Sequence, residues 1–154
     1  QQTMAHQCAM RLSSIAWVLM RSIACSLSSQ QELVGLFAFN KNLVSDDLAK
    51  LRYEASIRPG FQEAFSAMFP APRQRWVDSL ASDEGKIKTL THETMIIHGR
   101  DDAIIPLSAS LRLHDLIPKS QLHVFGQCGH WTQIEHSARF NQLLLNFFLE
   151  ANAK

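Results

Sequence analysis

The stretch Thr94–Gly99, with the sequence TMIIHG, decides the fold of this chain, because a short apolar run that ends at a glycine is typical of a buried strand. A second run of the same kind, QLHVFG, covers Gln121–Gly126. Between the two runs, Ser108 is expected to cap a helix that ends near Pro118. The order strand, helix, strand at this spacing predicts a parallel βαβ unit with a right-handed crossover.

A long final helix is expected after the second strand, and it completes a βαβα unit over residues 91–154. A parallel sheet of two strands cannot bury both of its faces or close its edges. We therefore expect an α/β fold in which this unit is the end of a larger sheet. The helix is indicated by apolar residues at helical spacing: Ala138, Phe140, Leu143, Leu144, Phe147 and Phe148.

The block 32–90 contains no strand pattern and is predicted to be helical. Ser45 is a hydroxyl cap followed by two acids, which is typical of a helix start. Pro59-Gly60 should end that helix, and further helices are expected from Phe61 and around Trp76–Leu80. Residues 1–31 are left unassigned, as a segment that is either disordered or not native.

Composition excludes several classes of protein. The chain has 154 residues, of which 46% are hydrophobic and 19% charged, and its net charge is +1. This balance argues against a basic face for nucleic acid, and no apolar run is long enough for a membrane span. Three cysteines are too few for a disulfide framework or a zinc cluster. We expect a cytoplasmic protein that binds no metal, nucleic acid or membrane.

The chemistry is expected in the loops that follow the two strands, since functional residues of open α/β sheets lie beyond the carboxyl ends of strands. Adjacent parallel strands would bring Asp102, in the first loop, close to His130, in the second. A carboxylate on the imidazole Nδ1–H leaves Nε2 free as a base. Taken alone, Asp102 fits a helix cap and His130 an ordinary loop histidine. Together they favour an acid–base pair.

Two segments around these loops indicate a particular family of enzymes. The strings IHGRDDAIIPLSASLRL and QLHVFGQCGHWTQIEH resemble the carboxy-terminal part of the meta-cleavage-product hydrolases, which belong to the α/β-hydrolase superfamily. The upstream string LFAFNKNLVSDDLAKLRYEASIRPGFQEAF resembles the helical cap, or lid, of the same enzymes. The resemblance implies a partial α/β-hydrolase fold, with a cap over 32–90 and the last two strand–helix units over 91–154. It also implies cleavage of a carbon–carbon bond in 2-hydroxy-6-oxo-dienoates.

The resemblance assigns roles to six residues. Asp102 and His130 match the acid and the base of a catalytic triad, and Arg52 matches a cap arginine that holds the dienoate carboxylate. Without the resemblance, Arg52 fits a solvated helix charge. Three further residues match apolar pocket positions, although each also fits plain core packing: Phe37, Ile104 and Trp131. No metal or organic cofactor is implied, the substrate is an acidic small molecule, and the full-length enzyme could be a homo-oligomer.

The nucleophile is missing from this sequence. The family needs a serine in a Gly-x-Ser-x-Gly turn, and no such string occurs in the 154 residues. The chain alone is therefore predicted to be inactive, because the covalent step and the oxyanion hole are lost. Two alternatives stay open. One is part of another α/β-hydrolase, such as a dehalogenase, epoxide hydrolase or esterase, and the other is a non-catalytic binding chain.

Overall fold

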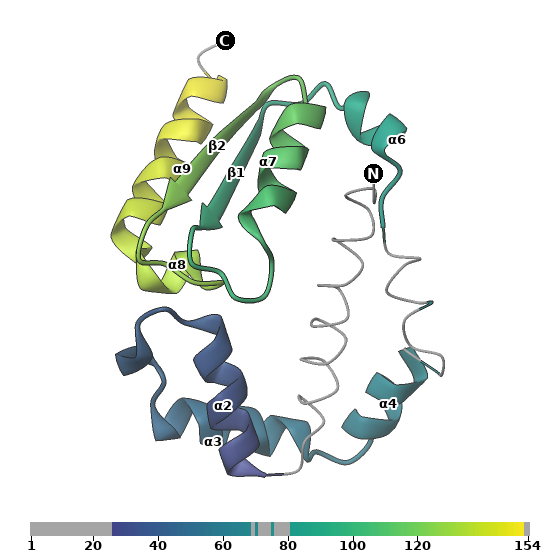
Figure 1. Ribbon diagram of the computed structural model, residues 1–154, viewed down its shortest axis with the longest axis vertical. Helices are drawn as coiled ribbons and strands as arrows, with labels where there is room; N and C mark the ends of the chain where they lie inside the picture. Colours follow the sequence, from purple (N-terminus) through teal and green to yellow (C-terminus); the bar gives the residue numbers. More distant parts are fainter. Residues whose placement is uncertain (1–25, 69, 71–74, 76–80, 153–154) are drawn as a thin grey trace, which may run out of the picture. The chain divides into compact units, whose positions relative to one another are not determined.

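The computed structural model describes residues 26–68, 70, 75 and 81–152 (Figure 1). The helix expected around Trp76–Leu80 and most of the unassigned segment 1–31 lie outside these residues. The chain divides into two compact units, which are treated separately below. The first unit contains residues 1–36 and 41–81, and the second contains residues 37–40 and 82–154. Phe37–Asn40 thus belongs to the unit that holds the two strands.

The first unit is mainly helical over its described residues, as the sequence predicts for the block 32–90. Its elements are α2 (Leu27–Phe37, of which Phe37 belongs to the second unit), the 3-10 helix η1 (Lys41–Leu43), α3 (Asp46–Ser56) and α4 (Phe61–Met68). Helix α2 begins at Leu27, inside the segment 1–31 that was expected to be disordered or not native, so that expectation is wrong for residues 27–31. The start of α3 confirms the predicted cap, since the Ser45 side chain accepts a hydrogen bond from the Leu48 amide at 3.1 Å. Gly60 has a φ of 80°, a left-handed conformation that separates α3 from α4.

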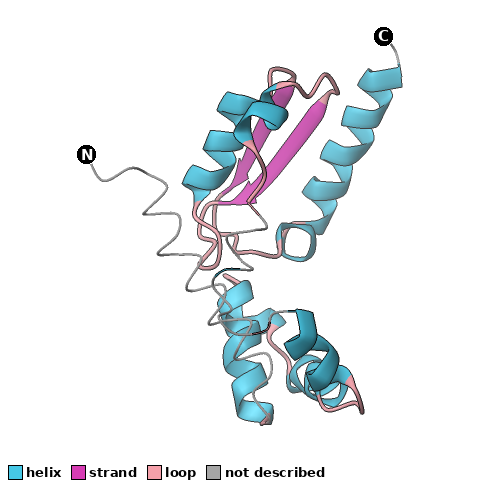
Figure 2. Ribbon diagram, turned by 90° about the vertical axis from the view of Figure 1, so that its right-hand side faces the viewer, coloured by secondary structure: helices cyan, strands magenta, loops and turns pink. Residues whose placement is uncertain are grey.

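The second unit contains the predicted βαβα order. Its elements are α6 (Glu84–Lys88), β1 (Thr94–Gly99), α7 (Leu107–Leu116), β2 (Ser120–Phe125), α8 (Thr132–Glu135) and α9 (Ser137–Asn152). The two strands pair in parallel, with a register that runs from Thr94 opposite Ser120 to Gly99 opposite Phe125. Helices α7 and α9 lie on opposite sides of the strands (Figure 2). The α/β class and the parallel topology are therefore confirmed.

The predicted cap of α7 is wrong. The helix begins at Leu107, its N-cap is Pro106, and no side chain caps it, so Ser108 lies inside the first turn. Pro106 has φ −70° and ψ 143°, an extended conformation that the proline ring favours and that leads directly into a helix. A fixed proline φ takes the place of the expected hydroxyl cap.

The two strands are only partly covered. Phe125 is buried at the end of β2, whereas most strand residues are half-buried and Val124 is 37% exposed. In α9, Leu145, Phe148 and Leu149 are 59–69% exposed. A parallel sheet with this little cover matches the expectation that the unit is the end of a larger sheet.

The loops after β1 and β2 approach each other closely at two glycines, Gly99 and Gly129. A Cβ on Gly99 would clash with the Gly129 carbonyl oxygen and lie 2.6 Å from that of Cys128. A Cβ on Gly129 would lie 2.6 Å from the Phe37 carbonyl oxygen and 2.8 Å from the Phe39 nitrogen. Neither glycine has a positive φ. Positions 99 and 129 therefore need glycine because neighbouring backbone atoms leave no room for a side chain, and not because the backbone turns tightly there.

We predict that Gly99→Ala destabilises the chain by about 1–3 kcal/mol or more, because the methyl group meets backbone atoms that cannot rotate away. Urea-induced unfolding followed by circular dichroism would measure the change in the free energy of unfolding.

Gly35→Ala is the matched control, since nothing lies within 4 Å of a Cβ at this position inside α2. It should be neutral or stabilise by about 0.5–1 kcal/mol, because alanine favours a helix more than glycine does. Equal effects of the two substitutions would contradict the close-approach explanation.

Candidate active site

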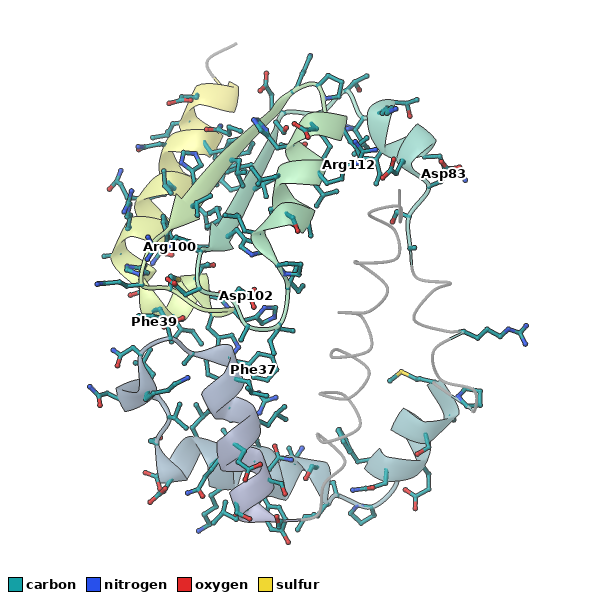
Figure 3. All side chains as sticks on the ribbon, in the orientation of Figure 1. Phe37, Phe39, Asp83, Arg100, Asp102 and Arg112 are labelled. Atoms are coloured by element: carbon teal, nitrogen blue, oxygen red, sulfur yellow. The ribbon has the colours of Figure 1, made fainter. Side chains whose placement is uncertain are left out.

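Asp102 lies in the loop after β1, at the end of the sheet towards which the strands run (Figure 3). One carboxylate oxygen, Oδ1, accepts hydrogen bonds from the amides of Ile104 at 2.7 Å and Ile105 at 3.0 Å. The other, Oδ2, lies 2.9 Å from Nδ1 of His130. The side chain is only 5% exposed. Both oxygens are engaged, so the carboxylate is held in a single orientation.

The environment of Asp102 keeps its carboxyl group ionised. Burial by itself would raise the pKa of Asp102, but hydrogen bonds from His130, Ile105 and Ile104 act in the opposite direction and prevail. The pKa of Asp102 is therefore lowered from its ordinary value. An ionised carboxylate only accepts hydrogen bonds, so Nδ1 of His130 carries a proton, and in the neutral imidazole the lone pair is on Nε2. This is the tautomer that a general base requires.

His130 lies in the loop after β2, and its side chain is 30% exposed. Its backbone amide donates to the Phe37 carbonyl oxygen at 2.7 Å. The Phe37 ring stacks on that of Trp131, with centroids 5.3 Å apart and planes 5° apart. The same Phe37 ring lies 5.3 Å from the His130 imidazole at a tilt of 48°. Four of the residues selected from the sequence therefore lie together, namely Asp102, His130, Trp131 and Phe37.

Ile104 lies in the same unit as Asp102 and His130, whereas Arg52 lies in the first unit. Ile104 is 7% exposed, and its amide contributes one of the hydrogen bonds to Asp102. Its backbone thus has a visible part in the site, whereas the sequence indicated only an apolar side chain. Arg52 is half-buried on α3, in the first unit, which is described by itself.

His98 holds the loop that carries Asp102 through one of its ring nitrogens and contacts α7 through the other. Its side chain is 8% exposed, its Nε2 lies 3.1 Å from the Ile105 carbonyl oxygen, and its Nδ1 lies 2.8 Å from Oγ of Ser110. A proton on Nε2 satisfies both contacts, with the Ser110 hydroxyl donating to Nδ1. His98 is the last-but-one residue of β1 and Ser110 lies on α7, so this pair joins the strand, the loop and the helix.

Cys128 and Asp101 complete the contact between the loops. The backbone amide of Cys128 donates to Oδ2 of Asp101 at 3.3 Å, and the Asp101 amide donates to the Cys128 carbonyl oxygen at 2.9 Å. Burial, together with the charges of Glu135, Asp101 and Asp102, raises the pKa of the Cys128 thiol to about 11. The thiol stays protonated near neutral pH and is a poor nucleophile.

Glu135 is a member of the site to which the sequence reading gave no role. Its Oε1 accepts a hydrogen bond from the Gly129 amide at 2.6 Å, and its Oε2 accepts one from the Asn40 amide at 2.8 Å. An acid five residues after a candidate base was the available signal. Its second partner, Asn40, is 95 residues away in the chain and has no signal in the local sequence.

Among the described residues, no group of three or more histidine, cysteine, aspartate and glutamate side chains could hold a metal ion. In the same part of the chain, no helix combines the length and the hydropathy needed to cross a membrane.

A sequence model of the family described as "alpha/beta hydrolase fold" matches residues 2–137. This chain belongs to the α/β-hydrolase family. The Asp102–His130 pair of this α/β-hydrolase thus lies where acids and bases are found in such folds, beyond the carboxyl ends of adjacent strands.

Three similar proteins indicate which kind of α/β-hydrolase the chain resembles. The chain is 64% identical, over 128 residues, to the 2-hydroxymuconate semialdehyde hydrolase of Pseudomonas sp. (strain CF600). It is 59% identical, over 122 residues, to the 2-hydroxy-6-oxo-2,4-heptadienoate hydrolase of Pseudomonas putida (strain F1). A solved structure of the meta-cleavage product hydrolase from Pseudomonas fluorescens IP01 matches with 62% identity and a TM-score of 0.77.

In each comparison, the matched region covers most of this chain but less than half of the other protein. They cover 83% of this chain but 45% of the CF600 enzyme, and 79% of this chain but 44% of the putida enzyme. For the solved structure, the shares are 82% of this chain and 46% of the other. The α/β-hydrolase described here thus spans less than half the length of these relatives, which agrees with a sheet of two strands in its described part.

We predict that Asp102→Asn lowers the free energy of unfolding by about 1–3 kcal/mol at pH 7, because a buried acceptor for His130 is lost. Since folding lowers the pKa of Asp102, its contribution is fully present above the unfolded-state pKa of about 3.9. The contribution disappears as the pH falls through the lowered folded-state value. Urea titrations from pH 7 downwards should show the gap between the two proteins narrowing below about pH 4.

Asp115→Asn, on the exposed surface of α7, is the control and should change stability at pH 7 by less than about 0.5 kcal/mol. A gap for Asp102→Asn that stays constant down to acidic pH would show that the charge of Asp102 does not contribute.

Proposed function

We propose that this chain is the carboxy-terminal part of a hydrolase that cleaves a carbon–carbon bond in 2-hydroxy-6-oxo-dienoates from catechol meta-cleavage. The observation that carries the proposal is the hydrogen bond of 2.9 Å between Nδ1 of His130 and Oδ2 of Asp102. It occurs in a chain that is 59–64% identical to two hydrolases whose names specify substrates of this class.

His130 moves the protons of the proposed reaction. With Nδ1–H donated to Asp102, Nε2 removes a proton from a nucleophile and later returns it to the leaving carbon. The imidazolium formed in between is stabilised by the Asp102 carboxylate. The net reaction adds water across the bond and releases a hydroxypentadienoate and a carboxylic acid. Since this sequence has no Gly-x-Ser-x-Gly, the serine nucleophile and the oxyanion loop would come from the rest of the enzyme.

The remaining residues select the substrate in this proposal. Arg52 holds the dienoate carboxylate, since a guanidinium group forms two parallel hydrogen bonds with a planar carboxylate. Phe37, Ile104 and Trp131 line the apolar part of the pocket. The stacking of Phe37 on Trp131, next to the His130 imidazole, supports this role for the two aromatic rings.

The expectations about cellular context belong to the same proposal. The intact enzyme would work in the cytoplasm on a small acidic substrate and could form a homo-oligomer. The net charge of +1 supports an enzyme without an electrostatic preference for nucleic acid.

The proposal is tested by restoring the missing half. We would join the amino-terminal part of the CF600 hydrolase to the region of this chain that matches the rest of that enzyme. The 154-residue chain alone should not bleach the yellow dienolate of 2-hydroxymuconate semialdehyde above background, whereas the chimera should do so. Asp102→Asn in the chimera should lower kcat by about 10⁴-fold, because the imidazole is left in the wrong tautomer.

Activity of the chain alone would contradict the need for a second half. A folded chimera without activity, or one that is insensitive to Asp102→Asn, would contradict the proposed function itself.

Arg52→Ala tests the class of substrate. Loss of a charge-assisted contact should raise KM for the dienoate by about 10- to 100-fold and leave KM for its methyl ester nearly unchanged. Arg58→Ala, in the exposed turn after α3, is the matched control and should change neither value. Equal effects on acid and ester would favour another α/β-hydrolase chemistry.

A further inference from the structure

The loop that carries His130 is held by backbone hydrogen bonds on both sides of Gly129. The Gly129 amide donates to Glu135, and the His130 amide donates to the Phe37 carbonyl oxygen at 2.7 Å. Glu135 then continues to Asn40 through its second oxygen. The carboxylate therefore joins the His130 loop to the segment Phe37–Asn40, and all of these residues belong to the second unit.

The geometry leaves little freedom at this point. Gly129 is buried, and even a methyl group there would meet Phe37, Phe39 and the Glu135 carboxylate. Both Glu135 oxygens accept from backbone amides, at 2.6 Å and 2.8 Å, which are short distances typical of charged acceptors. A shift of the carboxylate would therefore disturb Gly129, which precedes His130, and Asn40, which ends the segment that begins with the Phe37 carbonyl group.

We propose that Glu135 is a positioning residue for His130, and this inference rests on the proposed function. Glu135 does not touch the Asp102–His130 hydrogen bond. It fixes the backbone on the amino-terminal side of His130, while the Phe37 carbonyl oxygen fixes the amide of His130 itself. Together these contacts direct Nδ1 of the imidazole to Oδ2 of Asp102 and keep Nε2 where a nucleophile must approach.

A purely structural role for Glu135 predicts a different result. Two hydrogen bonds to backbone amides also stabilise a fold, and their loss lowers the thermal midpoint without a specific effect on the chemical step. A positioning role lowers kcat at temperatures where the variant is fully folded, and it leaves KM nearly unchanged. The split between kcat and KM therefore separates the two roles.

The test uses Glu135→Gln and Glu135→Ala in the chimera described above. Glutamine has the same shape but one amide oxygen, so it can accept from only one of the two backbone amides. We expect kcat to fall by about 10-fold for Glu135→Gln and by about 100-fold for Glu135→Ala, with KM within about twofold of the parent. Gln133→Ala, an exposed position on the same helix α8, is the control and should leave both constants unchanged.

A second measurement uses the 154-residue chain and does not depend on activity. Hydrogen exchange followed by NMR should show that the amides of Gly129 and Asn40 both lose protection in Glu135→Ala, that one of the two loses it in Glu135→Gln, and that both keep it in Gln133→Ala.

The outcomes separate this inference from the proposed function. An active parent chimera whose kcat is unaffected by Glu135→Gln and Glu135→Ala would overturn the positioning role alone. A parent chimera that is folded but inactive would overturn the proposed function and the catalytic part of the inference with it. Unchanged exchange at Gly129 and Asn40 would overturn the hydrogen-bonded connection itself, whatever the activity.

Discussion

The parallel pairing of β1 with β2 is the constraint on which the site depends. The register places Gly99 opposite Phe125, so both strands end at the same level and their loops start side by side. The Arg100 amide donates to the Phe125 carbonyl oxygen at 2.8 Å and the Asp101 amide to that of Cys128 at 2.9 Å, which extends the contact beyond the strands. Asp102 follows one residue later, within reach of His130.

The sequence was sufficient for the parts of the site that follow from this pairing. Two apolar runs, each ending at a glycine, predict two parallel strands, and the residues beyond them predict which side chains meet. The proximity of Asp102 and His130 follows from adjacent strands, because both residues lie in the loops that continue these strands. The helices of the first unit were likewise predictable, because Ser45 and Pro59-Gly60 act on neighbouring residues only.

Contacts between distant parts of the chain could not be predicted in this way. Nothing near Phe37 or Asn40 indicates that their backbone meets Gly129, His130 and Glu135, because a carbonyl oxygen and an amide hydrogen exist at almost every residue. The start of α7 is a smaller case. A hydroxyl near a helix start suggests a cap, yet Pro106 already sets the backbone.

The short distance along the chain between the two strands also explains why the Asp102–His130 hydrogen bond can form although the matched region covers 45% of the CF600 hydrolase. Asp102 and His130 follow consecutive strands joined by one helix, and the hydrogen bonds on Asp102 come from its own loop and from the next. A nucleophile turn needs its own strand and helix, and this sequence has no such turn. The hydrogen-bonded pair therefore needs the βαβ unit and the segment Phe37–Asn40 that holds the His130 loop, whereas the proposed reaction also needs further strands beside β1 and β2 to carry a nucleophile.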